Sequence, residues 1–289
     1  MVKFTKMQGC GNDYVYVNCL EDNIPDGSEI ARKVSKKHFG IGSDGLILIK
    51  PSKVADFFMD MYNADGSKSA MCGNGIRCVA KYVYDYGLTD KTIFDIETGA
   101  GIKHIQVETG EEKTLLGNIK KGNRVTMVTV DMGSPVITPS LVPVLLDGTQ
   151  IVDREITVGE ETYRITCVSM GNPHAICFVP DTKAIDIEKI GPLFEHHEIF
   201  PERVNTEFIQ VVSPNHINMR VWERGSGETL ACGTGACASV YACILNGLTE
   251  DEVTVSLLGG DLKIKYDREA HKIFMTGEAL TVFEGEITL

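Results

Sequence analysis

The sequence predicts an α+β fold of two pseudo-symmetric domains, each a β-barrel-like sheet wrapped around one central α-helix. A constant shift of 160 positions superimposes Cys72 on Cys232 and Gly11-Asn12 on Gly171-Asn172, which indicates two duplicated domains rather than the short units of a solenoid. The length of 289 residues independently suggests about two domains. Strand-like segments far outnumber convincing helices, which favours sheets as the main component of each domain.

Each half repeats one order of predicted elements. Apolar runs at 46–49 and 208–211 are typical of buried strands, and the alternating segments 57–62 and 217–222 predict a further strand in each half. A glycine-rich loop then leads into the predicted helix, followed by more strands.

The two predicted central helices begin after the repeated cysteines. Apolar residues recur at the three-and-four spacing of a buried helix face. Gly87 and Gly247 stand where a left-handed cap would end each helix. The buried faces consist of Ile76, Val79, Ala80 and Val83 in the first helix, and Ala236, Val240, Cys243 and Ile244 in the second.

The composition is typical of a soluble enzyme. Hydrophobic residues make up 43% of the chain, and the formal charge of −12 disfavours nucleic acid as a partner. No apolar run has membrane-spanning length, and the N-terminal residues lack the apolar region of a signal peptide. We therefore expect a cytoplasmic location, in which the nine cysteines stay reduced.

Two of the nine cysteines differ from the rest. Cys72 and Cys232 are each followed by Gly-x-Gly at a helix start, where the helix dipole and free N–H groups favour a thiolate. The alternative, a core cysteine beside a tight turn, would have to occur twice in register. The others are expected to be buried as small hydrophobic residues: Cys10, Cys19, Cys78, Cys167, Cys177, Cys237 and Cys243.

A pair of equivalent thiols suggests acid–base chemistry at carbon. If both face one cleft, a thiolate can remove a proton from one side of a carbon while a thiol donates one to the other side. The N–H groups of Gly73-Asn74 and Gly233-Thr234 would bind a carboxylate and stabilise the charge that develops. This is the chemistry of an amino-acid racemase or epimerase.

The motifs resemble those of the diaminopimelate epimerase family over essentially the full length. The resemblance implies interconversion of LL- and meso-2,6-diaminopimelate without pyridoxal phosphate or any other cofactor or metal, in lysine and cell-wall precursor biosynthesis. The family often forms homodimers. The segments that carry the resemblance are Gly11-Asn12-Asp13, Tyr62-Asn63-Ala64-Asp65-Gly66, Cys72-Gly73-Asn74-Gly75, Gly171-Asn172-Pro173-His174, Arg203-Val204-Asn205, Glu223-Arg224-Gly225 and Ala231-Cys232-Gly233-Thr234-Gly235.

Carried over by position, the resemblance makes Cys72 and Cys232 the proton acceptor and donor. His174 and Glu223 would tune the pKa values of the cysteines, and Glu223 would also contact a substrate amine. Without the resemblance, His174 is an ordinary residue after a turn proline and Glu223-Arg224 a solvated pair. The implied substrate-binding residues are Asn12, Asn63, Gly73, Asn74, Asn172, Asn205, Glu223, Arg224, Gly233 and Thr234.

The resemblance also implies the domain division. The final strand, around Leu280 to Leu289, would return to the first domain, which gives 1–130 plus 278–289 and 131–277 as the two domains. Two positions depart from the family: Gly45 stands where some relatives have a substrate-binding glutamine, and Leu230 where relatives often have a polar residue.

Other motifs fail on context. The GxGxxG pattern at 40–45 is followed by a predicted strand, whereas a dinucleotide site needs a helix there. Zinc is disfavoured because there is no CxxC pair, and His196-His197, expected to lie in a loop, has no spaced partner.

Three rival functions stay open at this point. Proline racemase and hydroxyproline epimerase relatives also pair two cysteines, but typically have histidine where this chain has Asn74. A cysteine hydrolase using His174 would leave one of the paired cysteines unexplained. A non-catalytic amino-acid binding protein would exchange no α-proton. If the thiols face each other, we expect them to form a disulfide in air in the empty site, and we expect domain closure on the substrate.

Overall fold

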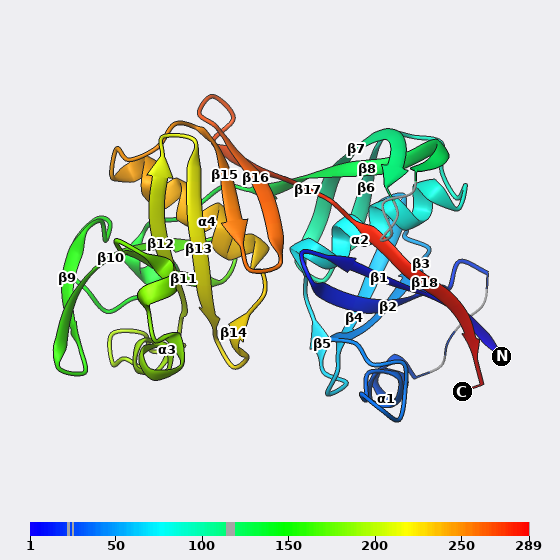
Figure 1. Cartoon of the computed structure of the whole chain (residues 1–289), viewed down its shortest axis with the longest axis horizontal. Helices are drawn as coiled ribbons and strands as arrows, with labels where there is room; N and C mark the ends of the chain where they lie inside the picture. The colour runs from blue at the N-terminus through cyan, green and yellow to red at the C-terminus, as the bar shows by residue number, and fades with distance from the viewer. Residues whose placement is uncertain (22–23, 25, 114–118, 289) are drawn as a thin grey trace. The chain divides into compact units, whose positions relative to one another are not determined.

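The computed structural model describes residues 1–21, 24, 26–113 and 119–288. Its internal contacts divide the chain into a first unit, Met1–Val130 with Thr276–Leu289, and a second unit, Asp131–Met275. The chain passes from one unit to the other in β8 (Ile119–Gly133) and returns in β17 (Lys272–Gly277) (Figure 1).

The strands of the first unit form a mixed sheet around one helix. The C-terminal strand pairs antiparallel with the N-terminal strand, so this strand lies in the first unit. Along the sheet, the pairs β2–β3 and β4–β6 are parallel, whereas β1–β2, β3–β4, β6–β7 and β7–β8 are antiparallel. In sheet order the strands are β18 (Leu280–Ile287), β1 (Val2–Gly9), β2 (Asn12–Asn18), β3 (Gly45–Lys50), β4 (Phe57–Asn63), β6 (Ile93–Thr98), β7 (Gly101–Lys113) and β8, with β5 (Lys68–Ser69) also on β4.

The second unit repeats this topology. Its parallel pairs are β11–β12 and β13–β15, at the positions equivalent to those of the first unit. β9 takes the place beside β10 that β18 takes beside β1. In sheet order the strands are β9 (Arg154–Val158), β10 (Glu161–Ser169), β11 (Pro173–Phe178), β12 (Asn205–Ser213), β13 (His216–Glu223), β15 (Glu252–Leu257) and β16 (Gly260–Asp267), with β14 (Gly227–Thr229) on β13. The α+β prediction is confirmed.

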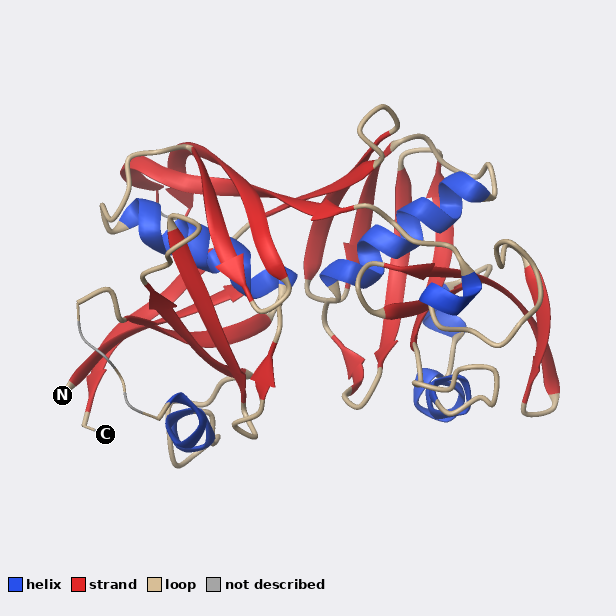
Figure 2. Cartoon of the chain, turned by 180° about the vertical axis from the view of Figure 1, so that it is seen from behind, coloured by secondary structure: helices blue, strands red, loops and turns tan. Residues whose placement is uncertain are grey.

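A central helix occupies each unit, α2 (Gly73–Asp85) in the first and α4 (Gly233–Leu245) in the second (Figures 1 and 2). The predicted apolar face of α2 is fully buried, and that of α4 is buried except for the half-buried Ile244. Gly87 and Gly247 adopt φ of 70° and 67°, the left-handed conformation that ends a helix most readily at glycine. Both helix predictions are therefore confirmed at both ends.

A second helix covers the opposite face of each sheet, and the sequence did not predict it. These helices are α1 (Gly27–Val34) and α3 (Ile187–Glu195). Along β3, Leu46 and Leu48 pack with residues of α1, whereas Ile47 points to the other face and to α2. Because β3 is buried on both faces, it reads as a continuous apolar run. Two short 3₁₀ helices, Pro139–Leu141 and Thr182–Ala184, complete the described elements of the second unit.

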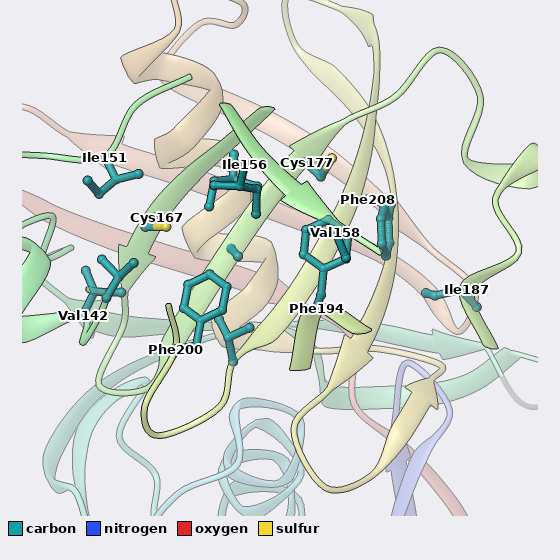
Figure 3. Packing of buried hydrophobic residues seen from close by; sticks show 14 residues of the cluster. Val142, Ile151, Ile156, Val158, Cys167, Cys177, Ile187, Phe194, Phe200 and Phe208 are labelled. Atoms are coloured by element: carbon teal, nitrogen blue, oxygen red, sulfur yellow. The ribbon is translucent and has the colours of Figure 1, made fainter. Parts of the chain in front are cut away.

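The core beneath α3 shows how the second unit is packed. In Figure 3, Phe194 of α3 lies beside Phe208 of β12, and their ring centroids are 5.7 Å apart in an edge-to-face arrangement. Such aromatic pairs contribute about 0.5–1.5 kcal/mol beyond the area they bury. Phe208 therefore anchors β12 from the side of α3, which leaves its neighbour Glu207 on the face toward α4.

Candidate functional site

The two repeated cysteines are the N-cap residues of the central helices. Cys72 precedes α2 and Cys232 precedes α4, both with extended backbone, and each backbone carbonyl accepts the first helical hydrogen bond. N–H groups of a first helical turn have no partner within the helix and favour anions. Each cysteine therefore stands at a positively polarised helix end, as the sequence predicts.

In the first unit, Cys72 is held by an asparagine. Its half-buried thiol donates to Asn12 Oδ1 at 3.2 Å, and its sulfur accepts from the Gly75 N–H at 3.3 Å. The Asn12 amide in turn donates to Asp44 Oδ2 at 2.7 Å, which also accepts from the Asp13 N–H. The exposed Asp44, which was not among the residues predicted from the sequence, thus fixes the orientation of the amide that faces the thiol.

Asn63, Asn74 and Gly73 complete the predicted set in this unit. Asn63 ends β4 and its amide donates to Ser67 Oγ, while Gly73 and Asn74 form the buried first turn of α2. Gly45 has no room for any side chain, because a Cβ there would clash with the Tyr62 carbonyl oxygen.

In the second unit, Cys232 lies in a more enclosed and more charged setting. Its side chain is buried, and its sulfur lies 3.5 Å from Thr234 Oγ1. Burial, followed by the negative charges of Glu223 and Glu207, raises the pKa of the Cys232 thiol well above its usual value, while Thr234 and the Gly235 N–H act in the opposite direction. The thiol form of Cys232 is therefore favoured at neutral pH.

Glu223 lies at the end of β13 and contacts the same thiol. Burial raises the pKa of its carboxyl group, and hydrogen bonds from Thr229 and Cys232 oppose that shift. A carboxyl group in contact with a thiol shifts the pKa of the thiol through its charge. Glu223 therefore lies where its charge acts on the pKa of the Cys232 thiol.

His174 reaches Cys232 through other side chains. Its Nε2 lies 3.0 Å from Asn172 Oδ1, and the Asn172 amide donates to Thr234 Oγ1 at 3.3 Å. Its Nδ1 lies 2.6 Å from Glu207 Oε1, and both of these side chains are fully buried. A chain of contacts thus runs from Glu207 to the thiol, and its first member was not predicted from the sequence.

The Asn205 side chain binds the backbone of Arg224. Asn205 Oδ1 accepts from the Arg224 N–H at 3.0 Å, and its amide donates to the Pro173 carbonyl. The Arg224 guanidinium donates to the carbonyl of Glu202 at 2.9 Å. The next residue, Gly225, donates its N–H to the buried Glu195, a second carboxylate that the sequence motifs did not indicate.

Other features of the described residues bear on the excluded motifs. The loop with the GxGxxG pattern leads into β3, a strand, as expected. His196 caps the end of α3 and His197 follows it, outside the helix. Six of the seven cysteines that the sequence assigns to the core are buried, and Cys10 is only half-buried.

Neither a metal centre nor a membrane span emerges from the part of the chain that the structure describes. Its His, Cys, Asp and Glu side chains form no group of three or more that could hold a metal ion. Its helices are too short or too polar to cross a bilayer.

Comparison with known proteins identifies the family. A family model described as diaminopimelate epimerase matches residues 4–138 and 166–282. A protein from Agathobacter rectalis named diaminopimelate epimerase is 55% identical, with all of both chains covered. One of the same name from Acetivibrio thermocellus is 50% identical over 100% of this chain and 99% of its own.

The chain belongs to the diaminopimelate epimerase family. It is accordingly an isomerase of the epimerase type. Among solved structures, a probable proline racemase from Agrobacterium radiobacter superimposes with a TM-score of 0.69 at 14% identity, covering 100% of this chain and 93% of that one. At that identity the likeness shows that the diaminopimelate epimerase family and this racemase share a fold.

Proposed function

We propose that this enzyme interconverts LL- and meso-2,6-diaminopimelate by a two-base mechanism that needs no pyridoxal phosphate. The observation that carries the proposal is the duplicated cysteine, twice the N-cap of a central helix and twice followed by Gly-x-Gly. The relatives named diaminopimelate epimerase, which are 55% and 50% identical over the full chain, support the choice of substrate.

In the proposed reaction, two proton transfers occur on opposite faces of one α-carbon. The thiolate of one cysteine takes the α-proton, so that the C–H bond breaks and its electron pair delocalises into the substrate carboxylate. The thiol of the other cysteine donates its proton to the opposite face and becomes a thiolate. Each turnover therefore exchanges the protonation states of Cys72 and Cys232, and the reverse reaction exchanges them back.

The helix ends supply the stabilisation that this carbanion requires. We propose that the reacting carboxylate binds at the N–H groups of Gly73-Asn74 and Gly233-Thr234, where helix dipoles favour negative charge. Donors aimed at a developing anion contribute about 10²–10³-fold in rate per donor removed. Because the electron pair moves into that same carboxylate, the proposed contacts strengthen as the proton leaves.

The distal amino-acid end of the substrate would bind the polar set around the two cysteines. In this proposal Asn12, Asn63, Asn172, Asn205 and Arg224 hold that end, and Glu223 contacts an amine. A directional hydrogen bond selects for its partner strongly, because a substrate that lacks the matching group leaves a buried polar atom unpaired. This polar set, and Asn74 in place of histidine, favour a substrate with a second charged end over proline.

A cysteine hydrolase is the less favoured alternative. The fully buried His174 has one ring nitrogen beside Glu207 and the other beside Asn172, so neither nitrogen is directed at a thiol in these contacts. A hydrolase needs its general base within hydrogen-bond reach of the nucleophile. The arrangement therefore favours proton transfer by the cysteines themselves.

We further propose, on the resemblance to the family, that the enzyme acts in the cytoplasm as a homodimer and supplies meso-diaminopimelate for lysine and cell-wall precursor biosynthesis. Light scattering coupled to size exclusion tests the dimer: a mass near 31.7 kDa at micromolar concentration would contradict it.

The decisive experiment follows the α-proton in deuterium oxide. Reduced protein without added cofactor is incubated with LL-diaminopimelate, and with proline in parallel, and the α-proton signal is followed by NMR. Deuterium should enter at the α-carbon as the meso isomer forms, because the donating thiol carries a solvent proton. Exchange with proline alone would move the assignment to the proline branch, and exchange with neither would contradict an epimerase of either substrate.

A further inference from the structure

Glu207 is a fully buried carboxylate in β12, between the buried residues Thr206 and Phe208. Its Oε1 contacts His174 Nδ1 at 2.6 Å. No hydrogen-bond partner for its Oε2 is found within the described part of the chain. Burying a carboxylate destabilises the folded state unless the charge is paired, so the presence of Glu207 at this position requires a specific explanation.

The repeat shows that the fold itself does not require a carboxylate there. The equivalent residue of the first unit is Ile47, which points from β3 toward Gly75 of α2. Glu207 points in the same way from β12 toward Gly235 of α4, where a Cβ would lie 2.5 Å from its Oε1. In the first unit an apolar side chain fills this position between sheet and helix. At the same position the second unit, which contains His174, has a carboxylate instead.

The hydrogen-bonding inventory of the imidazole explains what the carboxylate does. Both ring nitrogens of His174 have close polar neighbours, Glu207 on one side and Asn172 on the other. Each nitrogen faces an oxygen, Glu207 Oε1 at Nδ1 and Asn172 Oδ1 at Nε2, so the two contacts together hold the ring in one orientation.

The contacts continue from Asn172 to the thiol. The Asn172 amide donates to Thr234 Oγ1, and Thr234 Oγ1 lies 3.5 Å from Cys232 Sγ. His174, Glu207 and Thr234 come from β11, β12 and the first turn of α4, and Asn172 lies in the turn before β11. The network therefore holds the helix end against the sheet. The charged groups that act on Cys232 are Glu223 and Glu207, and His174 acts on Glu223.

We propose that Glu207 is a positioning residue for the Cys232 half of the reaction: it fixes the ring of His174, and through Asn172 and Thr234 it sets the orientation and the charge surroundings of the Cys232 thiol. This inference rests on the proposed function for its effect on turnover. Its effect on the thiol itself is independent of any substrate.

Two substitutions separate the two effects of the carboxylate. Glu207→Gln keeps an oxygen that can accept from His174 but removes the charge, whereas Glu207→Leu, which introduces an apolar side chain of the kind that Ile47 provides in the first unit, removes both. Because the negative charge of Glu207 contributes to raising the pKa of Cys232, its loss should move the pH midpoint of Cys232 alkylation to lower pH. Peptide mass spectrometry follows that midpoint in both variants.

Turnover should respond to the lost orientation. Glu207→Leu is expected to lower kcat by about 10- to 100-fold, the range caused by misplacement of a reacting group, and Glu207→Gln by less than about tenfold. Glu252→Gln is the matched control, because it makes the same change at an exposed carboxylate of the same unit, paired with Lys263. It should leave both the midpoint and kcat unchanged.

The outcomes distinguish this inference from the proposed function. An unchanged alkylation midpoint in Glu207→Gln, together with wild-type kcat, would overturn the positioning role even if the wild-type enzyme epimerises diaminopimelate. A shifted midpoint in Glu207→Gln supports the role even if wild-type protein fails to exchange that substrate. If Glu207→Leu does not fold, Glu207→Gln alone decides, since it retains the hydrogen bond and the volume.

Discussion

The two cysteine-bearing helix starts have the same backbone geometry and differ in the charged groups around the thiol. Each presents a cysteine as the N-cap of a thirteen-residue helix ended by a left-handed glycine. Around Cys72 the neighbouring groups are an asparagine amide and the backbone, with an exposed aspartate behind them. Around Cys232 they are the half-buried Glu223 and the buried Glu207, which is paired with His174. The repeat gives both thiols the same N-cap geometry. Different neighbouring residues in the two units give the thiols different charged surroundings.

In the proposed mechanism the two thiols hold one proton between them, and their unequal surroundings suit that role. Cys72 is half-buried, and Cys232 is buried with a raised pKa. In the proposed mechanism, Cys232 is thus the group that begins as proton donor. The following substitutions and measurements test this difference, beginning with the largest expected effect.

Loss of either thiol should have the largest effect. Cys72→Ala and Cys232→Ala are each expected to lower kcat for epimerisation by about 10²–10⁴-fold, because each removes a general acid or base. Coupled measurement of meso-diaminopimelate gives the rates. Cys78→Ala and Cys243→Ala, buried thiols of the same two helices, are the controls and should retain most activity. Near-normal turnover in either catalytic variant would contradict the two-base mechanism.

The thiols should also differ in reactivity toward iodoacetamide in the absence of substrate. Cys72 is expected to react about tenfold or more faster than Cys232 at pH 7, since thiolates are the reactive form and Cys232 is both buried and shifted to higher pKa. The Cys232 rate should keep rising as the pH is raised beyond the usual thiol range. Equal rates at pH 7, measured by peptide mass spectrometry, would remove the proposed inequality.

Adding one methyl group to each helix start should separate the halves further. At Gly235 the new Cβ meets the Glu207 carboxylate at 2.5 Å, whereas at Gly75 it meets the terminal methyl of Ile47 at 2.8 Å. Gly235→Ala should destabilise the protein by about 1–3 kcal/mol through overpacking and also disturb the Cys232 half. Gly75→Ala should cost less, because an isoleucine end rotates more easily than a paired carboxylate. Denaturant unfolding and kcat for both variants measure this, and a larger loss in Gly75→Ala would reverse the comparison.

The smallest effect is expected at Asp44. Asp44→Asn keeps one acceptor for the Asn12 amide but removes the charge, which should weaken a hydrogen bond by about 1 kcal/mol and lower kcat several-fold. Asp26→Asn, which changes an exposed carboxylate of the same unit that accepts from the Glu29 N–H at the start of α1, is the matched control. A steady-state assay that finds Asp44→Asn equal to this control would show that Asn12 needs no support from Asp44.

Much of the fold was predictable because its signals are local or repeated. The capping cysteine, the Gly-x-Gly and the terminal glycine mark both ends of α2 and α4, and the repeat doubles each signal. The outer helices were missed for local reasons. Pro192 stands inside α3, where proline usually breaks a helix, and α1 is only eight residues long, too short for a convincing periodic pattern.

The candidate site was predictable where motifs carry it, and less so where a contact forms across strands. Glu207 lies thirty-three residues from its partner His174, and parallel pairing of β11 with β12 brings them together. One signal was present in the sequence: a glutamate at the start of a buried strand, where the repeat places isoleucine. Asp44 and Glu195 gave no such signal, because exposed and terminal carboxylates are common in loops and at helix ends.

The enclosure of Cys232 has a consequence for isotopic labels. In the proposed mechanism a proton taken from the substrate by Cys232 enters a buried sulfur, where solvent reaches it slowly, whereas one taken by the half-buried Cys72 is exposed sooner. The free enzyme would then keep the substrate-derived hydrogen on the Cys232 sulfur after the product has left. At high substrate concentration, a deuterium atom removed by Cys232 would be delivered to the next molecule of the product isomer rather than to water, because the enzyme is left in the protonation state that catalyses the reverse reaction. Label would therefore pass from substrate to product molecules in one direction of the reaction more than in the other.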